Sequence, residues 1–237
     1  MLKIATISLL YFIPLVCGAA SRRPSTQSRR VCTNGLCFEQ FHHADLNVTV
    51  GFALPDRSDD RFPDELIVKT VFPLPYGYVG TRLGPVQSTL VKSLLVYAAY
   101  INNKEANSMQ FDASLSRAQL VEPVGTTLSP LNIPQLNSTF SPSLTNWDNG
   151  VGTYVLRCQQ CSVILDYLCA ASSNGQATLT TLFSREYPVY LDQARTVANL
   201  SSVGALVREA VLNVKQARFS NYSAMLEVAG LKDPAAQ

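Results

Sequence analysis

Two adjacent histidines, His42 and His43, are the side chains of this sequence with the widest range of chemistry, and they are its only histidines. An imidazole can serve as a general base or as a metal ligand near neutral pH. Successive residues of an extended chain point to opposite faces, so at most one of the two can turn into a protein core. A serine or cysteine hydrolase would need one of them as its base, and the sequence contains no nucleophile-elbow motif. We therefore expect surface or partly buried imidazoles without a catalytic role.

Cysteines are the second reactive group. Beyond Cys17 in the N-terminal segment, the sequence holds Cys32, Cys37, Cys158, Cys161 and Cys169. In an oxidising compartment such cysteines form disulfides, and an odd number leaves one thiol over. Asn34 and Gly35 form a strong turn pair that brings Cys32 and Cys37 together, which favours a bridge between them.

Cys158 and Cys161 form a C-x-x-C spacing at the end of an expected strand. Cysteines three apart in an extended strand are too distant to bond, so a bridge between them requires a turn at residues 159–160. This bridge is our first interpretation, and a bond from either cysteine to Cys169 is the alternative. A tetrahedral zinc site is not favoured, because no histidine lies near these cysteines in sequence.

Carboxylates and one aromatic side chain are the remaining chemical candidates. A carboxylate dyad, as glycoside hydrolases use, could come from the acidic segment that contains Asp59, Asp60, Asp64 and Glu65. Arg57 and Arg61 lie beside this acidic segment, a pattern more typical of a solvated loop. The only tryptophan, Trp147, lies in a polar stretch and could stack on a sugar ring. We expect it to close the end of the fold instead, because one aromatic side chain does not make a binding platform.

The N-terminus has the pattern of a secretory signal peptide, with Lys3, an apolar run over residues 4–17 and small residues at 18–20. The run is shorter than the roughly 20 residues that span a bilayer, so we expect cleavage of residues 1–20 and no membrane anchor. Four N-glycosylation sequons agree with secretion, at Asn47, Asn137, Asn199 and Asn221. We expect an extracellular protein in which residues 21–30 form a flexible leader.

Charge and length limit the kinds of partner and the number of domains. The 19 basic and 17 acidic side chains are scattered and give a formal net charge of +2, whereas nucleic-acid-binding domains concentrate positive charge on one face. We therefore expect no nucleic-acid partner. The chain fits one β-rich domain, which we place at residues 31–230, with a tail at 231–237.

Short strands are expected along most of the domain. Val48, Val50 and Phe52 alternate with small or polar residues, the two-residue period of a half-buried strand. Other segments predict further strands, at residues 65–71, 77–83, 93–100, 119–122, around 140 and at 152–158. Repeated short strands indicate a β-sandwich, because each sheet hides one face by stacking on another.

The C-terminal third gives a mixed pattern. The apolar residues of 203–214 fit one helical face and also contain strand-like pieces, so the sequence leaves this segment open. Residues 220–228 predict a short helix, with Ser220 as N-cap and Gly230 just past its end. The expected fold class is all-β, an antiparallel β-sandwich with a short C-terminal helix.

Five motifs occur in an order that is similar to a known family: CTNGLCF at 32–38, GFALP at 51–55, GYVG at 77–80 followed by LG at 83–84, SLLV at 93–96, and RCQQC at 157–161. Together they resemble the cytochrome domain of cellobiose dehydrogenases and its stand-alone fungal relatives, a branch of the DOMON superfamily. The resemblance extends over residues 31–165 and more loosely to 226. It implies an immunoglobulin-like antiparallel sandwich that holds a b-type haem between a methionine and a histidine and exchanges single electrons with a partner.

The resemblance places the family's haem ligands at Leu90 and Leu200. Leu90 stands three residues before the small residue that opens an apolar run, and Leu200 stands four before Gly204. A saturated hydrocarbon has no lone pair to offer iron. The two methionines beyond residue 20, Met109 and Met225, fall at neither place, and we interpret them as core fillers.

Two functional hypotheses follow. The first is a secreted, non-catalytic binding module that has lost its haem ligands, so that no cofactor is expected, and that binds a small molecule, a carbohydrate or an extracellular protein. The alternative is an extracellular electron-transfer protein that retains haem b through His42 or His43 and Met109 or Met225. An enzyme is the third class, and it requires the carboxylates around Glu65 to converge in a cleft. A membrane is not expected as a partner.

Overall fold

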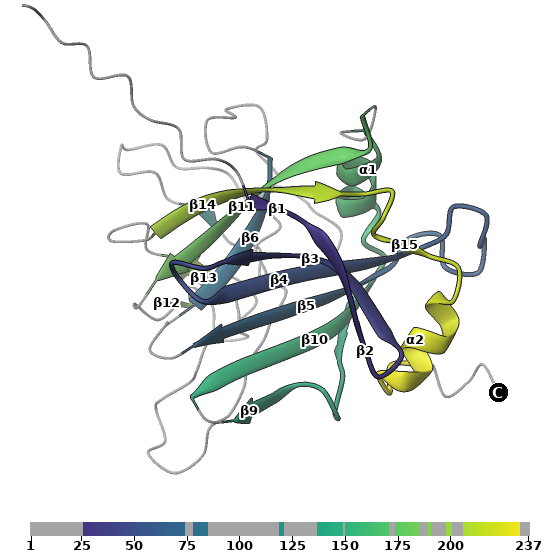
Figure 1. Ribbon diagram of the computed structural model, residues 1–237, viewed down its shortest axis with the longest axis horizontal. Coiled ribbons are helices and arrows are strands. Elements are labelled where there is room, and N and C mark those ends of the chain that lie inside the picture. Colours follow the sequence, from purple (N-terminus) through teal and green to yellow (C-terminus); the bar gives the residue numbers. More distant parts are fainter. Residues whose placement is uncertain are drawn as a thin grey trace, which may run out of the picture.

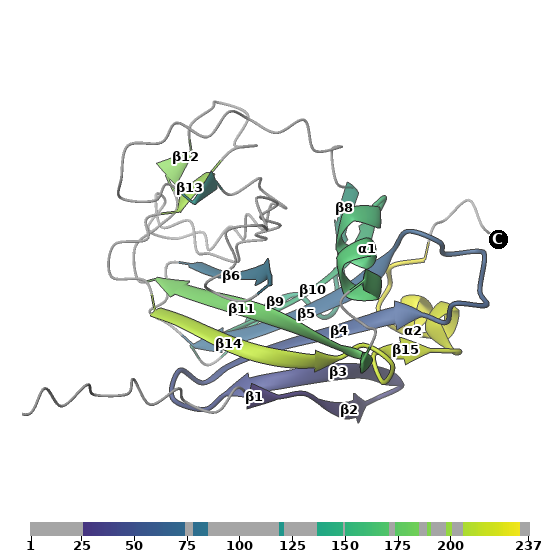
Figure 2. The same cartoon turned by 90° about the horizontal axis from the view of Figure 1, so that it is seen from above.

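The computed structural model describes residues 26–73, 78–84, 119–120, 137–148, 150–170, 174–184, 189–190, 198–200 and 206–232. Most of these residues lie in strands of two sheets that pack face to face as a sandwich (Figures 1 and 2). The larger sheet contains, in spatial order, β2 (Arg29–Thr33), β3 (Leu36–His43), β4 (Val48–Pro55), β5 (Leu66–Pro73), β10 (Val151–Gln159) and β8 (Asn137–Phe140). In addition, β9 (Asn146–Asp148) pairs with β10, and β15 (Arg218–Phe219) pairs with β4.

The smaller sheet has four strands, in the order β1 (Thr26–Gln27), β14 (Leu206–Asn213), β11 (Gln176–Ser184) and β6 (Tyr78–Leu83). Three short strands form a further sheet, in the order β12 (Val189–Tyr190), β13 (Ala198–Leu200) and β7 (Gln119–Leu120). The helices are α1 (Ser162–Ala170) and α2 (Tyr222–Val228), both at the end of the sandwich drawn on the right in Figure 1. None of the helices in the described part of the chain is long and apolar enough to cross a membrane.

The main core lies between the two sheets. Alternate residues of the larger sheet face it, among them Val50, Phe52 and Val68, and the smaller sheet contributes Leu179 and Leu212. Each of these side chains is at most 1% exposed. The two-residue period of the strands therefore places one apolar row of each strand against the opposite sheet.

A second apolar layer covers part of the outer face of the larger sheet. There α2 and the residues after it pack on Phe38, Ala53, Ile67 and Val155, with Tyr222, Met225 and Leu226 supplied by the helix. At this end the larger sheet is thus buried on both faces. Its strands carry apolar residues on the inner and the outer rows for this reason.

The predicted antiparallel β-sandwich with a short C-terminal helix is confirmed. The strands expected at residues 47–54, 65–71, 77–83 and 152–158 correspond to β4, β5, β6 and β10, and those near 119 and 140 to β7 and β8. The strand expected at 93–100 lies outside the described residues. The segment left open at 203–214 contains strand β14, which pairs with β11 over its whole length.

The C-terminal helix begins one position later than expected. Its first helical residue is Tyr222, and Asn221 rather than Ser220 occupies the N-cap position. Asn221 makes no side-chain hydrogen bond to the helix, so a capping signal at Ser220 did not determine the start. Gly230 lies just past the helix with φ +64°, as the sequence predicted.

The longer elements that were not expected from the sequence are β3, β11 and α1, and the short strands β9, β12, β13 and β15 were not expected either. In addition, Thr26 and Gln27 form β1, and residues 29–30 begin β2, although we expected a flexible leader up to residue 30. Ser28 explains this pairing, because its backbone N–H donates to the Val211 carbonyl at 3.0 Å. Described strand structure therefore begins before residue 31, the boundary predicted for the domain.

Candidate functional site

His43 lies between the two sheets, near the end of β3. It is 2% exposed, and its Nε2 lies 3.2 Å from Thr181 Oγ1 on β11. The rings of Phe41 and Phe183 pack edge-on against the imidazole, with centroid distances of 5.3 and 5.6 Å. Burial among these groups lowers the pKa of His43 from 6.5 to about 4, so the ring is neutral at neutral pH.

His42 points to the opposite face of the same strand. It is exposed, and its Nδ1 lies 2.9 Å from Thr49 Oγ1 on β4. The prediction that at most one histidine of the pair turns inward is confirmed. Each imidazole has a hydroxyl partner, on the adjacent strand for His42 and on the opposite sheet for His43, which is what a structural histidine requires.

Met225 lies in the outer apolar layer, where it is fully buried in α2. His43 packs in the inner layer, so the larger sheet separates the methionine from the buried imidazole. Met109 lies outside the described residues. Among the described residues, no group of three or more histidine, cysteine, aspartate or glutamate side chains could hold a metal ion.

The acidic segment does not form a carboxylate pair in the described structure. Glu65 is buried and forms an ion pair with Arg157, whose Nε lies 2.7 Å from Glu65 Oε2. Asp64 is exposed. Farther along the loop Asp59 pairs with Arg61 at 2.7 Å, and this arginine holds the pKa of Asp59 below its usual value. The adjacent carboxylates of Asp64 and Glu65 thus lie in different surroundings, one exposed and one buried, as expected where a loop leads into a strand.

Both predicted disulfides are present. Cys32 and Cys37 lie directly opposite each other on β2 and β3, and Cys158 bonds Cys161. The turn required at residues 159–160 is there, because Gln160 has φ +58°. Cys169 lies outside both disulfides, and its Sγ accepts a hydrogen bond from Arg218 Nη2 at 3.3 Å.

The four predicted glycosylation sites fall in different positions. Asn47 and Asn221 are exposed, one in the turn before β4 and the other at the start of α2. Asn137 is the first residue of β8 and Asn199 lies within β13, and the side chains of both are outside the description. Occupancy of all four stays a prediction. Trp147 belongs to β9, and the placement of its indole is also outside the description.

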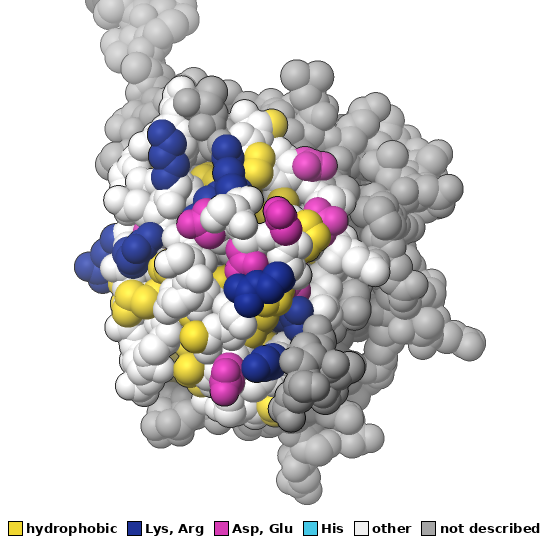
Figure 3. Space-filling view, turned by 90° about the vertical axis from the view of Figure 1, so that its right-hand side faces the viewer, with side chains coloured by type: hydrophobic (Ala, Val, Ile, Leu, Met, Phe, Trp, Pro, Cys, Tyr) yellow, Lys and Arg dark blue, Asp and Glu magenta, His cyan; other side chains and the backbone are white. Residues whose placement is uncertain are grey.

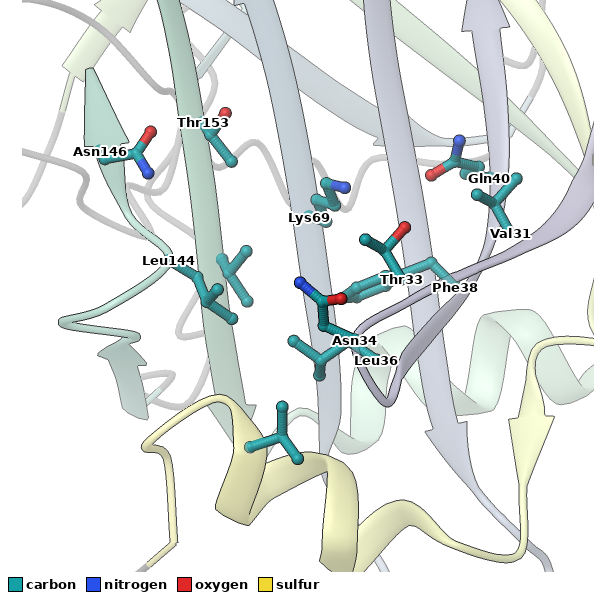
Figure 4. Close-up of a pocket in the computed structure, with 12 residues that line it drawn as sticks. Val31, Thr33, Asn34, Leu36, Phe38, Gln40, Lys69, Leu144, Asn146 and Thr153 are labelled. Atoms are coloured by element: carbon teal, nitrogen blue, oxygen red, sulfur yellow. The ribbon is translucent and has the colours of Figure 1, made fainter. Parts of the chain in front are cut away.

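A pocket of about 200 Å³ opens on the outer face of the larger sheet, beside the end of α2 (Figure 4). Its apolar lining is Val31, Leu36, Phe38, Leu144, Val155 and Val228. Its neutral polar lining is Thr33, Asn34, Gln40, Asn146 and Thr153. Lys69 of β5 is the one ionisable side chain among the described lining residues.

Lys69 lies over an apolar floor. Its Nζ is 5.7 Å from the centroid of the Phe38 ring, close enough for a cation–π interaction. Burial lowers the pKa of Lys69 from its usual value of 10.5.

The charged side chains elsewhere are mixed. Figure 3 shows the face drawn on the right in Figure 1, where basic and acidic side chains are interspersed among apolar ones. This agrees with the scattered charge of the sequence. The expectation that no nucleic acid is bound stays a prediction.

Comparison with known proteins identifies the family. The sequence profile of the cytochrome domain of cellobiose dehydrogenase matches residues 32–224. This chain belongs to that family. No curated protein matches the sequence.

Two solved structures share the fold of this cytochrome-domain family member. One is the cytochrome b domain of pyranose dehydrogenase from Coprinopsis cinerea, with 17% identity and a TM-score of 0.59 over 86% of this chain and 95% of the other. The second is the cytochrome domain of Myriococcum thermophilum cellobiose dehydrogenase, with 16% identity and a TM-score of 0.50 over 85% of this chain and 96% of the other. The family resemblance noted in the sequence is therefore confirmed.

Family membership implies haem b, and the described residues can be tested for a fit to it. Haem iron in such domains needs ligand atoms with lone pairs, such as an imidazole nitrogen and a thioether sulfur. His43 is enclosed by two phenylalanine rings, and Met225 lies on the other side of the larger sheet. The described side chains therefore do not offer the methionine–histidine pair. Leu90 lies outside the described residues, and Leu200 is placed only as a backbone residue of β13, opposite Leu120.

Sequence reasoning found the histidines and missed the outer pocket. The pocket's lining residues range from Val31 to Val228, so no local motif contains it. One signal was present: Lys69 interrupts an otherwise apolar or β-branched strand with a charge. A charged residue in the middle of such a strand indicates that its outer face is not wholly covered by apolar side chains.

Proposed function

We propose that this member of the cellobiose dehydrogenase cytochrome-domain family has lost axial haem ligation and acts as a secreted, non-catalytic binding module. Its ligand is a small molecule, a carbohydrate or an extracellular protein. The single observation that carries the proposal is that each of the only two histidines has a hydroxyl partner in surroundings that suit a structural role. One is exposed with Thr49 as its partner, and the other is enclosed in the inner layer with Thr181 as its partner.

Two further observations support the proposal. The positions at which the resemblance leads us to expect the family's ligands, Leu90 and Leu200, carry hydrocarbon side chains. The two disulfides suit an oxidising compartment, in agreement with the signal-peptide pattern of residues 1–20. Extracellular localisation is thus part of the proposal.

Haem titration tests the proposal. The purified protein is mixed with equimolar haemin, and its visible spectrum is recorded in the oxidised and reduced states. We expect no sharp, redox-sensitive Soret band, because no histidine and methionine face each other across a haem-sized space in the described structure. The double variant Leu90→Met/Leu200→His restores both family ligands and is expected to gain a six-coordinate spectrum.

The outcomes separate the hypotheses. A sharp six-coordinate spectrum of the unmodified protein would contradict the proposal and make this an electron-transfer protein. The matched variants His42→Gln and His43→Gln would then identify the imidazole that binds iron. A double variant without haem would contradict the placement of the ligands at Leu90 and Leu200.

A further inference from the structure

The pocket on the outer face of the larger sheet is built by the fold. Phe38, Leu36 and Val155 form its floor and are at most 7% exposed. The hairpin turn at Asn34 and the segment that contains Asn146 form opposite sides of the rim, as Figure 4 shows. The disulfide between Cys32 and Cys37 ties the two strands of that hairpin together. The pocket is therefore bounded by a restrained hairpin on one side and by a strand of the sheet on the other.

Gly51 of β4 lets Phe38 lie close to the sheet. It is paired with Gln40 on one side and with Lys69 on the other. A Cβ at this position would be 3.0 Å from Phe38 Cβ and 3.1 Å from Gln40 Cβ, tighter than ordinary packing. Glycine thus leaves the room in which the Phe38 ring lies beneath Lys69 Nζ.

Lys69 gives the pocket its charge. It is half-buried, it is the one ionisable group among the described lining residues, and its Nζ lies 5.7 Å from the centroid of the Phe38 ring. A part-buried ammonium group among apolar side chains is stabilised by an anion that replaces its lost water. The pocket is therefore complementary to a negatively charged ligand.

The size and the floor of the pocket limit the body of that ligand. An apolar cavity of about 150 Å³ holds one benzene molecule, and this pocket has about 200 Å³. It therefore accommodates a single ring with small substituents. The buried floor of Leu36, Phe38 and Val155 is apolar, which favours an aromatic ring over a sugar ring.

We infer that the pocket binds a small aromatic carboxylate, with its ring on the floor formed by Leu36, Phe38 and Val155 and its carboxylate on Lys69 Nζ. The side-chain amides of Asn34 and Asn146 lie at the rim, where they can hydrogen-bond a ring hydroxyl. This inference rests on the proposed function, because it gives the binding module its site and its ligand class.

Calorimetric titration with 4-hydroxybenzoate tests the inference. The unmodified protein binds the acid, and the uncharged analogue 4-hydroxybenzamide binds at least about tenfold more weakly because it cannot pair with Lys69. Lys69→Met weakens binding of the acid by a similar factor, and Lys69→Arg retains it. The matched control Lys215→Met removes an exposed lysine elsewhere and leaves binding unchanged.

A second pair of variants acts from the rim and avoids the floor. Val228 is 46% exposed, so both glutamate and glutamine are tolerated there. Val228→Glu places a negative charge at the rim of the pocket, which repels the carboxylate and weakens binding at least severalfold, whereas Val228→Gln has a much smaller effect. Urea unfolding of each variant confirms that the fold is retained.

Three results would overturn the inference: no binding of 4-hydroxybenzoate, equal binding by the unmodified protein and Lys69→Met, or stronger binding of glucuronate than of the aromatic acid. None of them bears on haem, because Lys69 lies on the outer face. Failure of the proposed function has its own signature, a six-coordinate haem spectrum of the unmodified protein that Lys69→Met leaves intact.

Discussion

Adjacent positions on one strand give the two imidazoles opposite surroundings. The alternation of side chains along β3 directs His42 to solvent and His43 into the core. An imidazole in the core is tolerated because Thr181 supplies a hydrogen-bond partner and because the ring stays neutral at neutral pH. Because the folded chain keeps the ring neutral, acid should lower the free energy of unfolding.

Protonation of His43 should destabilise the fold between pH 6.5 and pH 4. In this window the unfolded chain binds a proton that the folded chain excludes, so the free energy of unfolding falls as the pH is lowered. Asp45 opposes the lowered pKa, whereas Arg208 and His42 contribute to it. We expect His43→Gln to remove roughly 3 kcal/mol of this acid sensitivity, measured by urea unfolding at pH 7 and pH 4.

The matched control is His42→Gln. It removes the exposed imidazole, which is the smallest contributor to the lowered pKa of His43, and should keep most of the pH dependence of the unmodified protein. The prediction concerns the difference between the two pH values, so a constant loss of stability in His43→Gln leaves it intact. Parallel pH profiles for His43→Gln and the unmodified protein would contradict it.

At the scale of elements, the sequence predicts strands best where one face is apolar and the other is polar or small. In β4, Thr49 and Gly51 separate the apolar inward residues, and the strand was predicted. In β3 the inward row contains Glu39 and His43, while the outward row contains Phe38. His43 has its hydrogen-bond partner on β11, Glu39 accepts from Ser28, and Phe38 is covered by the outer layer, so the local pattern does not mark a strand.

Helix α1 was missed for a related reason. Its sequence, SVILDYLCA, is a mainly apolar run whose first part is typical of a strand. In the structure the turn at Gln160 ends β10, and Ile164, Leu165 and Leu168 bury one side of the helix. Tertiary packing selects the helix there, and a propensity argument does not include it.

The candidate site also has some features that the local sequence predicts and others that depend on tertiary contacts. Opposite placement of the histidines and both disulfides followed from local geometry, namely side-chain alternation and turn formation. The outer pocket did not, because the β2–β3 hairpin, β5, β10 and α2 meet only in the folded chain. Lys69 alone gave a local signal.

The C-terminal segment is attached to the larger sheet through a buried ion pair. Arg157 on β10 donates from Nε to Glu65, and from Nη1 to the Leu231 carbonyl at 2.9 Å. Glu65→Gln removes the charge that compensates a buried guanidinium, so we expect a loss of about 3 kcal/mol in the free energy of unfolding. Urea denaturation at pH 7 measures this loss.

Two variants control that prediction. Lys232→Met disrupts an exposed pair with Glu227, separated by 3.8 Å, and should change the free energy of unfolding by less than about 0.5 kcal/mol. The double variant Glu65→Gln/Arg157→Met removes both charges and should recover part of the loss. If Glu65→Gln is as stable as the unmodified protein, the ion pair contributes no net stability.

At the scale of the whole molecule, the N-terminal segment joins the two sheets. Strand β1 pairs in parallel with β14 of the smaller sheet, and β2 pairs with β3 of the larger one, with Ser28 between them. Ser28 Oγ donates to Glu39 Oε1 at 2.5 Å and accepts from the Asn213 N–H at 2.8 Å. One residue thus contacts both layers, and the segment expected to be a flexible leader closes one edge of the sandwich.

Removal of this connection should weaken the whole sandwich. We compare a chain that starts at Thr26 with one that starts at Val31, the domain boundary predicted from sequence. The shorter chain loses the hydrogen bonds of Ser28 and leaves buried Glu39 without that partner, so its free energy of unfolding should be lower by about 3 kcal/mol in urea at pH 7. Within the longer chain, Ser28→Ala should account for about 1 to 2 kcal/mol, and Arg29→Ala, an exposed neighbour, for less than about 0.5 kcal/mol. Equal stability of the two chains would show that the segment is a leader after all, paired with the sheets but not needed by them.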